Sequence, residues 1–355
     1  MKLKVTFVLP GPGNTPCGGY KIVYEYANFL AENDYDVSIG FDCRNIGKVR
    51  KLPEIIRKIF RYPIAKYRVN KYPTWFSLSK DIHKFCIFDE NIPYTDYCIA
   101  TAYGTSALVA MQKESKRVYL IQDLENWGNV SYKQVINSYK MFNNRIVVSN
   151  WLLQILKNEA LKGNNKLIVN GINLTKYKLL TPIDSRKLHT AAMLYHQAPY
   201  KGSCYGIDLL CRLKRKYDDF EAVLFGVPER PNDLPSWIKY IQNASVEQLV
   251  KIYNESLIYI LPSIEEGFGL TGVESMACGC VLCTSDFRGS KEYAVHLQNA
   301  MVSPVKNVEL MMKNVENLYE DEELRLKIAK NAIESAKNFD KNKAQNEFLK
   351  FIKQI

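Results

Sequence analysis

Two glutamates that flank a glycine-rich stretch are the residues of this 355-residue chain best placed for chemistry. Glu266 and Glu274 are separated by seven residues, which include Gly267, Gly269 and Gly272. Glycines let a backbone approach a ligand closely, and a helix beginning near Thr271 would offer free N–H groups to an anion. A carboxylate accepts two hydrogen bonds, which suits the paired hydroxyls of a ribose. The segment can therefore bind a phosphate, a ribose and a sugar together, unless the two acids only cap an ordinary helix.

Strands and helices alternate along the whole chain, and this pattern is expected to place the glycine-rich stretch at the edge of a sheet. Apolar runs predict buried strands, and apolar residues at helical spacing predict helices between them. In the first half we expect helices at 20–32 and 151–160, and strands at 4–9, 37–41, 97–101, 117–122, 145–149 and 166–169. In the second half we expect strands at 190–194, 221–225, 257–261 and 281–284, and helices at 207–216, 245–254, 271–278, 308–319 and 321–338.

This alternation predicts an α/β protein with two Rossmann-like, doubly wound domains, each built on a parallel sheet. Thr181-Pro182 breaks the pattern, so the first domain is expected to cover residues 1–180 and the second 181–340. Residues 341–355 are expected to form a C-terminal helix that returns toward the first domain. Doubly wound sheets bind ligands at the carboxyl ends of their strands, which predicts a ligand in a cleft between the domains.

The residues around Glu266 resemble those of the retaining glycosyltransferase family 4, whose members have the GT-B fold of two Rossmann-like domains facing a central cleft. The stretch from Pro262 to Gly279 follows that family's E-x7-E block. The resemblance covers nearly the whole chain except residues 40–95. Further similar segments are Gly18-Gly19 in the first glycine loop, Val147 to Trp151, Val169 to Asn173, and Tyr200-Lys201-Gly202.

The resemblance implies that the protein moves a sugar from a nucleotide sugar to a glycan acceptor, with retention of anomeric configuration, in cell-surface polysaccharide or glycan biosynthesis. It implies that Glu266 contacts the donor sugar, that Glu274 binds the ribose, and that Lys201 neutralises the diphosphate leaving group. It also implies that the departing phosphate helps to take the acceptor proton. The donor would be held further by Gly18, Gly19, Gly267, Phe268, Gly269, Leu270 and Thr271.

Two positions depart from the family pattern. His196 stands where the family has an arginine, and a protonated imidazole could still bind phosphate, but less firmly than a guanidinium that is always charged. The run from Gln122 to Glu125 replaces a histidine-bearing segment, as in some rhamnosyltransferase-like members. Asp123 in this run is expected either to face the reacting sugar or acceptor hydroxyl, or to cap the next helix. The catalytic candidates are therefore Glu266, Lys201, Asp123 and His196.

Neither a metal nor a cofactor is expected. Asp123 and Glu125 have the D-x-E spacing of acid pairs that bind Mg²⁺ or Mn²⁺ in other glycosyltransferases, but this spacing occurs by chance in many chains. Three cysteines form a C-x-C-x-x-C pattern at Cys278, Cys280 and Cys283. A helix end and an apolar strand surround them, so their thiols are expected to be buried in packing.

A basic segment from Lys48 to Lys71 accounts for much of the net charge of +11. Its nine Lys and Arg residues are opposed only by Glu54, and tyrosines and isoleucines are interleaved with them. Such a segment can lie on anionic lipid, or it can be a solvated face over an aliphatic core. No apolar run is long enough for a signal peptide or a membrane span. We therefore expect a cytoplasmic protein, peripheral on the inner membrane face, with an acceptor that is lipid-linked.

The donor base remains open between UDP, dTDP and GDP sugars. Base selection is expected at the loop after Phe225 and near Tyr240 and Ile241. A sugar-nucleotide epimerase of the same fold and a non-catalytic nucleotide-sugar-binding partner of a glycosyltransferase complex are the alternatives. Nucleic-acid binding is disfavoured because no zinc-finger, RRM or helix-turn-helix pattern occurs. A Rossmann oxidoreductase is disfavoured because the first glycine loop is not G-x-G-x-x-G.

Overall fold

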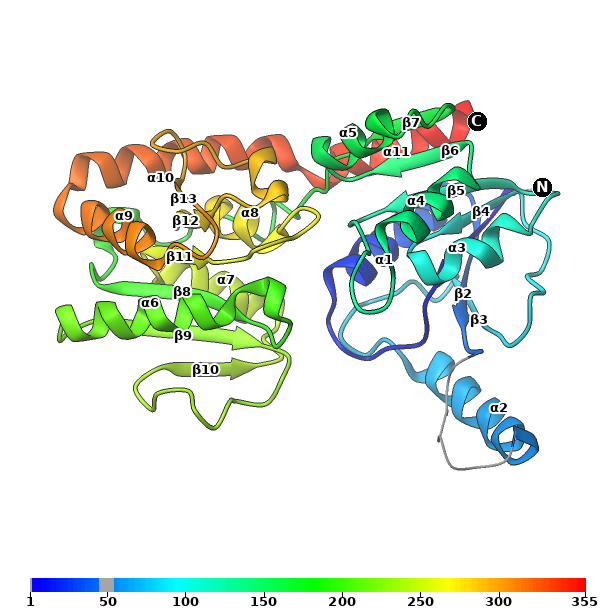
Figure 1. The fold of residues 1–355 in the computed structure, drawn as a ribbon, viewed down its shortest axis with the longest axis horizontal. Coiled ribbons are helices and arrows are strands. Elements are labelled where there is room, and N and C mark those ends of the chain that lie inside the picture. Colours follow the sequence, from blue (N-terminus) through cyan, green and yellow to red (C-terminus); the bar gives the residue numbers. More distant parts are fainter. Residues whose placement is uncertain (1, 45–53) are drawn as a thin grey trace. The chain divides into compact units, whose positions relative to one another are not determined.

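The computed structural model describes residues 2–44 and 54–355 and divides the chain into two compact units. The first unit contains Met1–Ile168 and Gln345–Ile355, and the second contains Val169–Ala344. Each unit is an α/β domain built on one sheet (Figure 1). Lys48, Arg50 and Lys51 of the basic segment lie outside the described residues.

The first unit has a seven-stranded sheet in the order β3-β2-β1-β4-β5-β6-β7, and neighbouring strands are all parallel. Its strands are β1 (Lys4–Leu9), β2 (Asp36–Asp42), β3 (His83–Ile87), β4 (Tyr97–Ala100), β5 (Lys116–Ile121), β6 (Asn144–Val147) and β7 (Asn164–Leu167). Its helices are α1 (Gly18–Glu32), α2 (Glu54–Lys71), α3 (Tyr103–Ala110), α4 (Tyr132–Lys140), α5 (Asn150–Asn158) and most of α11 (Lys341–Gln354).

The second unit has a six-stranded parallel sheet in the order β10-β9-β8-β11-β12-β13. Its strands are β8 (Thr190–Tyr195), β9 (Glu221–Gly226), β10 (Lys239–Gln242), β11 (Ile258–Leu261), β12 (Val281–Ser285) and β13 (Met301–Ser303). Its helices are α6 (Ser203–Lys216), α7 (Val246–Glu255), α8 (Leu270–Ala277), α9 (Val308–Glu320) and α10 (Glu322–Ala336).

Apolar patterning explains why these segments fold as they do. The central strand β11 is a continuous apolar run, and β1 is apolar apart from Lys4 and Thr6, because helices cover both faces of a parallel sheet. The last helix, α11, drawn in red in Figure 1, completes the first unit, where the Phe348 ring stacks on Tyr26 with centroids 4.2 Å apart. Lys166 of β7 and Glu347 of α11 form an ion pair at 2.8 Å on the same side. The end of the chain is therefore part of the core of the first unit.

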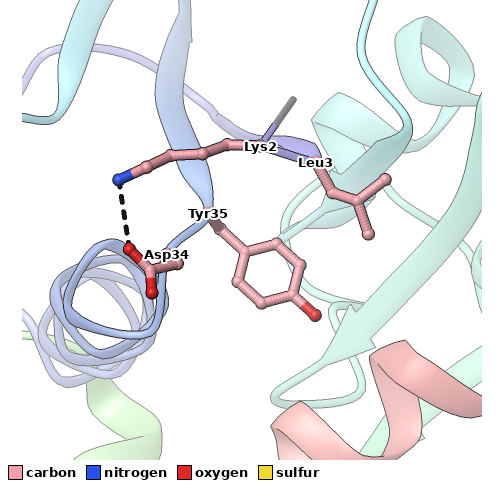
Figure 2. Close-up of a pocket in the computed structure, with 4 residues that line it drawn as sticks. All are labelled: Lys2, Leu3, Asp34 and Tyr35. Carbon is pink, nitrogen blue, oxygen red and sulfur yellow. Dashed lines mark ion pairs between the residues drawn. The ribbon is translucent and has the colours of Figure 1, made fainter.

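Strand order reverses once in each sheet, between β1 and β4 in the first unit and between β8 and β11 in the second. Ligands of doubly wound domains bind outside the carboxyl ends of the strands at such a reversal. The surface hollow in Figure 2 is lined by Lys2, Leu3, Asp34 and Tyr35, which precede β1 and β2. It lies at the amino ends of these strands, and therefore away from the carboxyl ends, where doubly wound sheets bind ligands.

Candidate functional site

Lys201 and Glu266 meet at the carboxyl edge of the second sheet, in the loops that follow β8 and β11. The Lys201 Nζ lies 2.9 Å from the Glu266 Oε2, and the two side chains are only 22% and 10% exposed. The Ser263 hydroxyl donates a hydrogen bond of 2.5 Å to the other carboxylate oxygen, Oε1. The carboxylate is therefore held from both sides, and a cation stands beside it at the reversal of strand order.

The backbone joins these two loops directly. Tyr200 precedes Lys201, and its carbonyl oxygen accepts hydrogen bonds from the N–H groups of Ile264 and Glu265 at 2.8 and 3.2 Å. Gly202 has φ of +67°, and a Cβ at this position would overlap the Pro262 carbonyl oxygen. Only glycine allows so close an approach in this conformation, so the Lys-Gly pair is needed to bring the ammonium group to Glu266.

The glycine loop leads into α8 as the sequence predicts, with the helix beginning at Leu270. Gly269 is its N-cap residue, with φ of +88°. The Tyr293 hydroxyl donates to the Gly269 carbonyl oxygen at 3.1 Å, and the Phe268 ring packs on Tyr293 and Phe339. Phe268 thus anchors the loop that leads into α8 in the core of the second unit. Tyr293 and Phe339 have no motif of their own, and sequence reasoning missed both.

Glu274 lies in the second turn of α8 and is only 4% exposed. Tyr240 and Ile241 lie on the edge strand β10, which pairs with β9. The Tyr240 hydroxyl donates to the Pro228 carbonyl oxygen at 2.6 Å and so braces the loop that follows β9.

His196 directly follows β8, and hydrogen bonds to its backbone and to its ring hold it in place. Its N–H donates to the Ser203 Oγ, and the Ser203 hydroxyl donates back to its carbonyl oxygen, both at 2.9 Å. The Ala198 N–H donates to the His196 Nδ1 at 2.9 Å, which requires a lone pair on that nitrogen. Burial and the charge of Lys201 lower the pKa of His196, against the opposing effect of Glu266. Both the contact to Nδ1 and the lowered pKa favour the neutral form of this imidazole.

In the first unit, the glycine loop after β1 contacts the loop after β5. Gly18 and Gly19 are the first residues of α1, and the Gln122 side-chain amide donates to the Gly19 carbonyl oxygen at 3.2 Å. The Leu124 N–H donates to the Asp123 Oδ1 at 2.8 Å. The next helix, α4, is capped by Ser131, so the prediction that Asp123 caps it is wrong. Asp123 instead organises its own loop at the carboxyl edge.

Glu125 lies in the same loop, and its Oε1 accepts a hydrogen bond of 3.0 Å from the Tyr103 N–H at the start of α3. Burial raises the pKa of Glu125 to about 7, helped by the negative charge of Asp123 and opposed by the Tyr103 N–H. The sequence singles out Glu125 only through its D-x-E spacing. Its half-buried position and its contact with α3 come from tertiary packing and have no local signal.

The three cysteines of the C-x-C-x-x-C pattern are buried, as expected from the surrounding helix end and strand. The Cys280 thiol donates to the Tyr253 carbonyl oxygen at 2.9 Å, and burial raises the pKa of Cys278, Cys280 and Cys283. Across residues 2–44 and 54–355, no three His, Cys, Asp or Glu side chains gather in an arrangement that could hold a metal ion.

The described outer face of α2 combines aromatic and basic side chains. Tyr62 and Tyr67 are 56% and 59% exposed, whereas Ala65 and Val69 are buried, and the Tyr62 ring stacks on Phe88 with centroids 5.1 Å apart. The Lys71 Nζ contacts the Tyr67 hydroxyl at 2.8 Å. Within the part of the chain that the structure describes, no helix is long and apolar enough to cross a membrane.

Known proteins resemble the chain in sequence. Residues 187–335 match the family described as "Glycosyl transferases group 1". An N,N'-diacetylbacillosaminyl-diphospho-undecaprenol alpha-1,3-N-acetylgalactosaminyltransferase of Campylobacter jejuni is 25% identical over 61% of this chain and 62% of its own length. The match thus spans less than two thirds of that relative. An uncharacterized glycosyltransferase of Haemophilus influenzae is 24% identical over 92% of this chain and 93% of its own length.

Solved structures extend the likeness to both units. A sucrose-phosphate synthase from Thermosynechococcus elongatus has a TM-score of 0.74 at 13% identity and covers 99% of both chains. The Anabaena protein HepE, solved with UDP and glucose, has a TM-score of 0.73 at 16% identity and covers 99% of this chain and all of its own. The chain therefore has the fold of GT-B glycosyltransferases, two Rossmann-like domains, and its residues 187–335 resemble the glycosyl transferases group 1 family.

Proposed function

We propose that the protein is a retaining glycosyltransferase of family 4 that transfers a sugar from a nucleotide diphosphate sugar, without a metal, to a lipid-linked glycan acceptor. The observation that carries this proposal is the pairing of Lys201 with Glu266 at the reversal of strand order in the second sheet. A cation and a carboxylate fixed 2.9 Å apart, beside the start of α8, suit a ligand that carries both phosphates and sugar hydroxyls.

Each group has a part in this proposal. The Lys201 ammonium and the N–H groups at the start of α8 stabilise the diphosphate as it departs. Glu266 accepts hydrogen bonds from the donor sugar, and Glu274 accepts them from the ribose. Neutral His196 contributes an Nε2–H donor in place of the positive charge of an arginine. The acceptor hydroxyl attacks from the side that the phosphate leaves, which retains the anomeric configuration.

The donor and acceptor follow by analogy with the relatives. HepE was solved with UDP and glucose, and the Campylobacter relative is named for an undecaprenol-linked diphosphate acceptor. We therefore place UDP-sugars first among donors, ahead of dTDP- and GDP-sugars. The acceptor class we propose is a polyprenyl diphosphate-linked sugar of cell-surface glycan biosynthesis.

The α2 face suits a membrane-borne acceptor. Exposed Tyr62 and Tyr67 beside Lys66, Arg68 and Lys71 match an interfacial helix, whose rings enter the headgroup region while cations meet anionic lipid. We propose that this face holds the enzyme on the cytoplasmic leaflet. Co-sedimentation with vesicles tests this: binding that rises with phosphatidylglycerol content supports it, and equal or absent binding with and without anionic lipid contradicts it.

A transfer assay tests the function itself. Wild-type protein is incubated with UDP-N-acetylgalactosamine, UDP-N-acetylglucosamine or UDP-glucose, a short-chain polyprenyl diphosphate-linked N-acetylhexosamine, and excess EDTA. Formation of an elongated lipid with an α-linkage by NMR supports the proposal. Loss of activity in EDTA contradicts metal independence. Interconversion of the donor without transfer identifies an epimerase, and donor binding without turnover identifies a non-catalytic partner.

A further inference from the structure

A buried serine holds the carboxylate that we assign to the donor sugar. Ser263 follows β11 and is only 1% exposed. Its hydroxyl donates to the Glu266 Oε1 at 2.5 Å, while the Lys201 Nζ lies 2.9 Å from the Oε2. A buried hydroxyl is costly unless it is hydrogen-bonded, and the contact with Glu266 supplies that bond. All three residues belong to the second unit, so this arrangement is complete within one domain.

The two contacts together fix the plane of the Glu266 carboxylate. The last side-chain torsion of a glutamate has a broad, roughly two-fold preference, so an ion pair alone leaves the carboxylate free to turn. Here the ammonium and the hydroxyl engage different oxygens, which holds the carboxylate in one orientation. An ionised carboxylate can accept about four hydrogen bonds, so both oxygens keep capacity for a ligand. The Ser263 hydroxyl therefore sets the direction in which this capacity points.

Two further serines hold Ser263 in place from the neighbouring strand. Strand β12 pairs with β11, and the hydroxyl of Ser285, its last residue, donates to the Ser263 carbonyl oxygen. The Ser290 hydroxyl, in the short helix η3 (Arg288–Glu292), donates to the Ser285 carbonyl oxygen at 3.2 Å. Ser285 and Ser290 are each 1% exposed. The serine that orients Glu266 is therefore itself fixed by buried hydrogen bonds, and satisfied networks of this kind are rigid.

The backbone of η3 packs against the same loop. A Cβ at Gly289 would lie 2.7 Å from the Glu266 carbonyl oxygen and 2.8 Å from the Phe268 nitrogen, closer than side-chain carbons approach such atoms. Glu266 is thus held at its backbone as well as at its carboxylate. A hydrogen-bond acceptor fixed in advance favours a ligand whose hydroxyls must be held in one geometry, because little ordering is needed on binding.

We propose that Ser263 is a positioning residue that orients the Glu266 carboxylate for the hydroxyls of the donor sugar. This inference rests on the proposed function, in which Glu266 accepts hydrogen bonds from that sugar. Ser263 acts only through Glu266, whereas the phosphates and the ribose are assigned to Lys201, α8 and Glu274. Loss of the Ser263 hydroxyl should therefore weaken the binding of a UDP-sugar and spare the binding of UDP.

Isothermal titration calorimetry separates the two contributions. The ligands are UDP and whichever of UDP-glucose, UDP-N-acetylglucosamine and UDP-N-acetylgalactosamine the wild type binds most tightly. Ser263→Ala should weaken the binding of the UDP-sugar by about tenfold, the effect of one hydrogen bond to a charged group, and that of UDP by less than about twofold. Ser275→Ala is the matched control, because Ser275 is equally buried in the second unit and its hydroxyl donates to the Gly272 carbonyl oxygen at 2.7 Å. It should change the binding of both ligands alike.

A double-mutant cycle shows whether Ser263 acts through Glu266. Glu266→Ala should itself weaken the binding of the UDP-sugar. Adding Ser263→Ala to it should weaken that binding by less than about twofold more, because residues that share one contact do not have additive effects. Ser263→Cys keeps the size of the side chain but replaces the hydroxyl with a weak donor, so it should reproduce the loss seen in Ser263→Ala without leaving a cavity. It serves as the test variant if Ser263→Ala does not fold.

The outcomes separate this inference from the function on which it rests. Wild-type affinity for the UDP-sugar in the folded Ser263 variants, or an equal loss of affinity for UDP and the UDP-sugar, overturns the role of Ser263. A full further loss on adding Ser263→Ala to Glu266→Ala overturns it as well. A wild type that binds no UDP-sugar, or a Glu266→Ala protein that binds it as tightly as the wild type, contradicts the proposed donor site instead.

Discussion

The carboxyl edges of the two sheets share a topology and differ in charge. At the second edge, Lys201 and Glu266 form an ion pair, and the loops that carry them are joined through Tyr200. At the first edge, the charged groups of the β5 loop are two carboxyls, Asp123 and Glu125. The shared strand order positions both sets of loops, while the side chains decide the ligand. The second edge offers a cation to an anionic ligand, whereas the β5 loop of the first edge offers carboxylate hydrogen-bond acceptors.

Removing the cation of the second edge should have the largest effect. Lys201→Met should lower kcat for transfer by about 10²- to 10³-fold, because the developing charge of the diphosphate loses its main partner. The variant also leaves Glu266 buried without its cation, which costs stability. A double variant, Lys201→Met with Glu266→Gln, should regain the melting temperature but not the activity. A fall of less than threefold in Lys201→Met would contradict the assignment of this edge to the leaving group.

Glu274 tests whether the same edge binds the ribose. Glu274→Gln should weaken the binding of UDP by about 10- to 100-fold, because hydrogen bonds to a charged acceptor are lost. Isothermal titration calorimetry at fixed pH and salt measures this change. Deoxyuridine diphosphate, which lacks the 2′-hydroxyl, serves as the matched ligand. Glu274→Gln should weaken the binding of deoxyuridine diphosphate less than it weakens the binding of UDP. An equal loss of affinity for both ligands would show that Glu274 affects binding only by supporting the fold.

The aromatic face of α2 tests whether the first unit approaches lipid. Tyr62→Ser with Tyr67→Ser should reduce binding to anionic vesicles by about three- to tenfold, because both rings are exposed and available to the headgroup region. The melting temperature should fall only slightly, because the variant loses the stacking of Tyr62 on Phe88 but neither tyrosine ring is buried. Substitution of Tyr94, which is 60% exposed and lies outside α2, is the control and should leave vesicle binding intact. An equal loss of vesicle binding in the Tyr94 control would contradict a specific role of α2 in membrane binding.

The ionisation of His196 gives the smallest expected effect. Its imidazole resonances, followed by NMR, should titrate with a midpoint below the ordinary value of 6.5, since burial and Lys201 both lower the pKa. In Lys201→Met the midpoint should rise by less than about one pH unit, because only one of the two causes is removed. A wild-type midpoint above 6.5 would show that the second edge carries two cations rather than one.

Much of this fold follows from local pattern. The buried runs of β1, β8 and β11 and the helical spacing of α1, α9 and α10 all predict the observed elements within a few residues. The missed elements have weak signals. The edge strand β10 is half-buried and polar at both ends, and β13 has only three residues. Helix α2 lies in the basic segment, where the many Lys and Arg residues obscure the apolar residues at helical spacing.

The candidate site also has residues that the sequence predicts and properties that it does not. Glu266, Glu274 and Lys201-Gly202 lie in short linear motifs, so spacing alone singles them out. Tyr293, which holds Gly269, comes 24 residues later in the chain, and only the packing of the second unit brings the two together. The lowered pKa of His196 depends on burial and on Lys201, and the raised pKa of Glu125 depends on burial. Such properties come from tertiary environment and cannot be predicted from residue type.

Nucleotide binding is the most direct test of the central claim that the second edge is the donor site. UDP, dTDP and GDP are added to the wild type, to Lys201→Met and to Glu274→Gln, and the melting temperature of each is measured, since a ligand that binds only the folded state raises it. We predict that UDP raises the melting temperature of the wild type and that both substitutions reduce this rise. No rise with any of the three nucleotides, or a rise that both substitutions leave intact, would contradict the account.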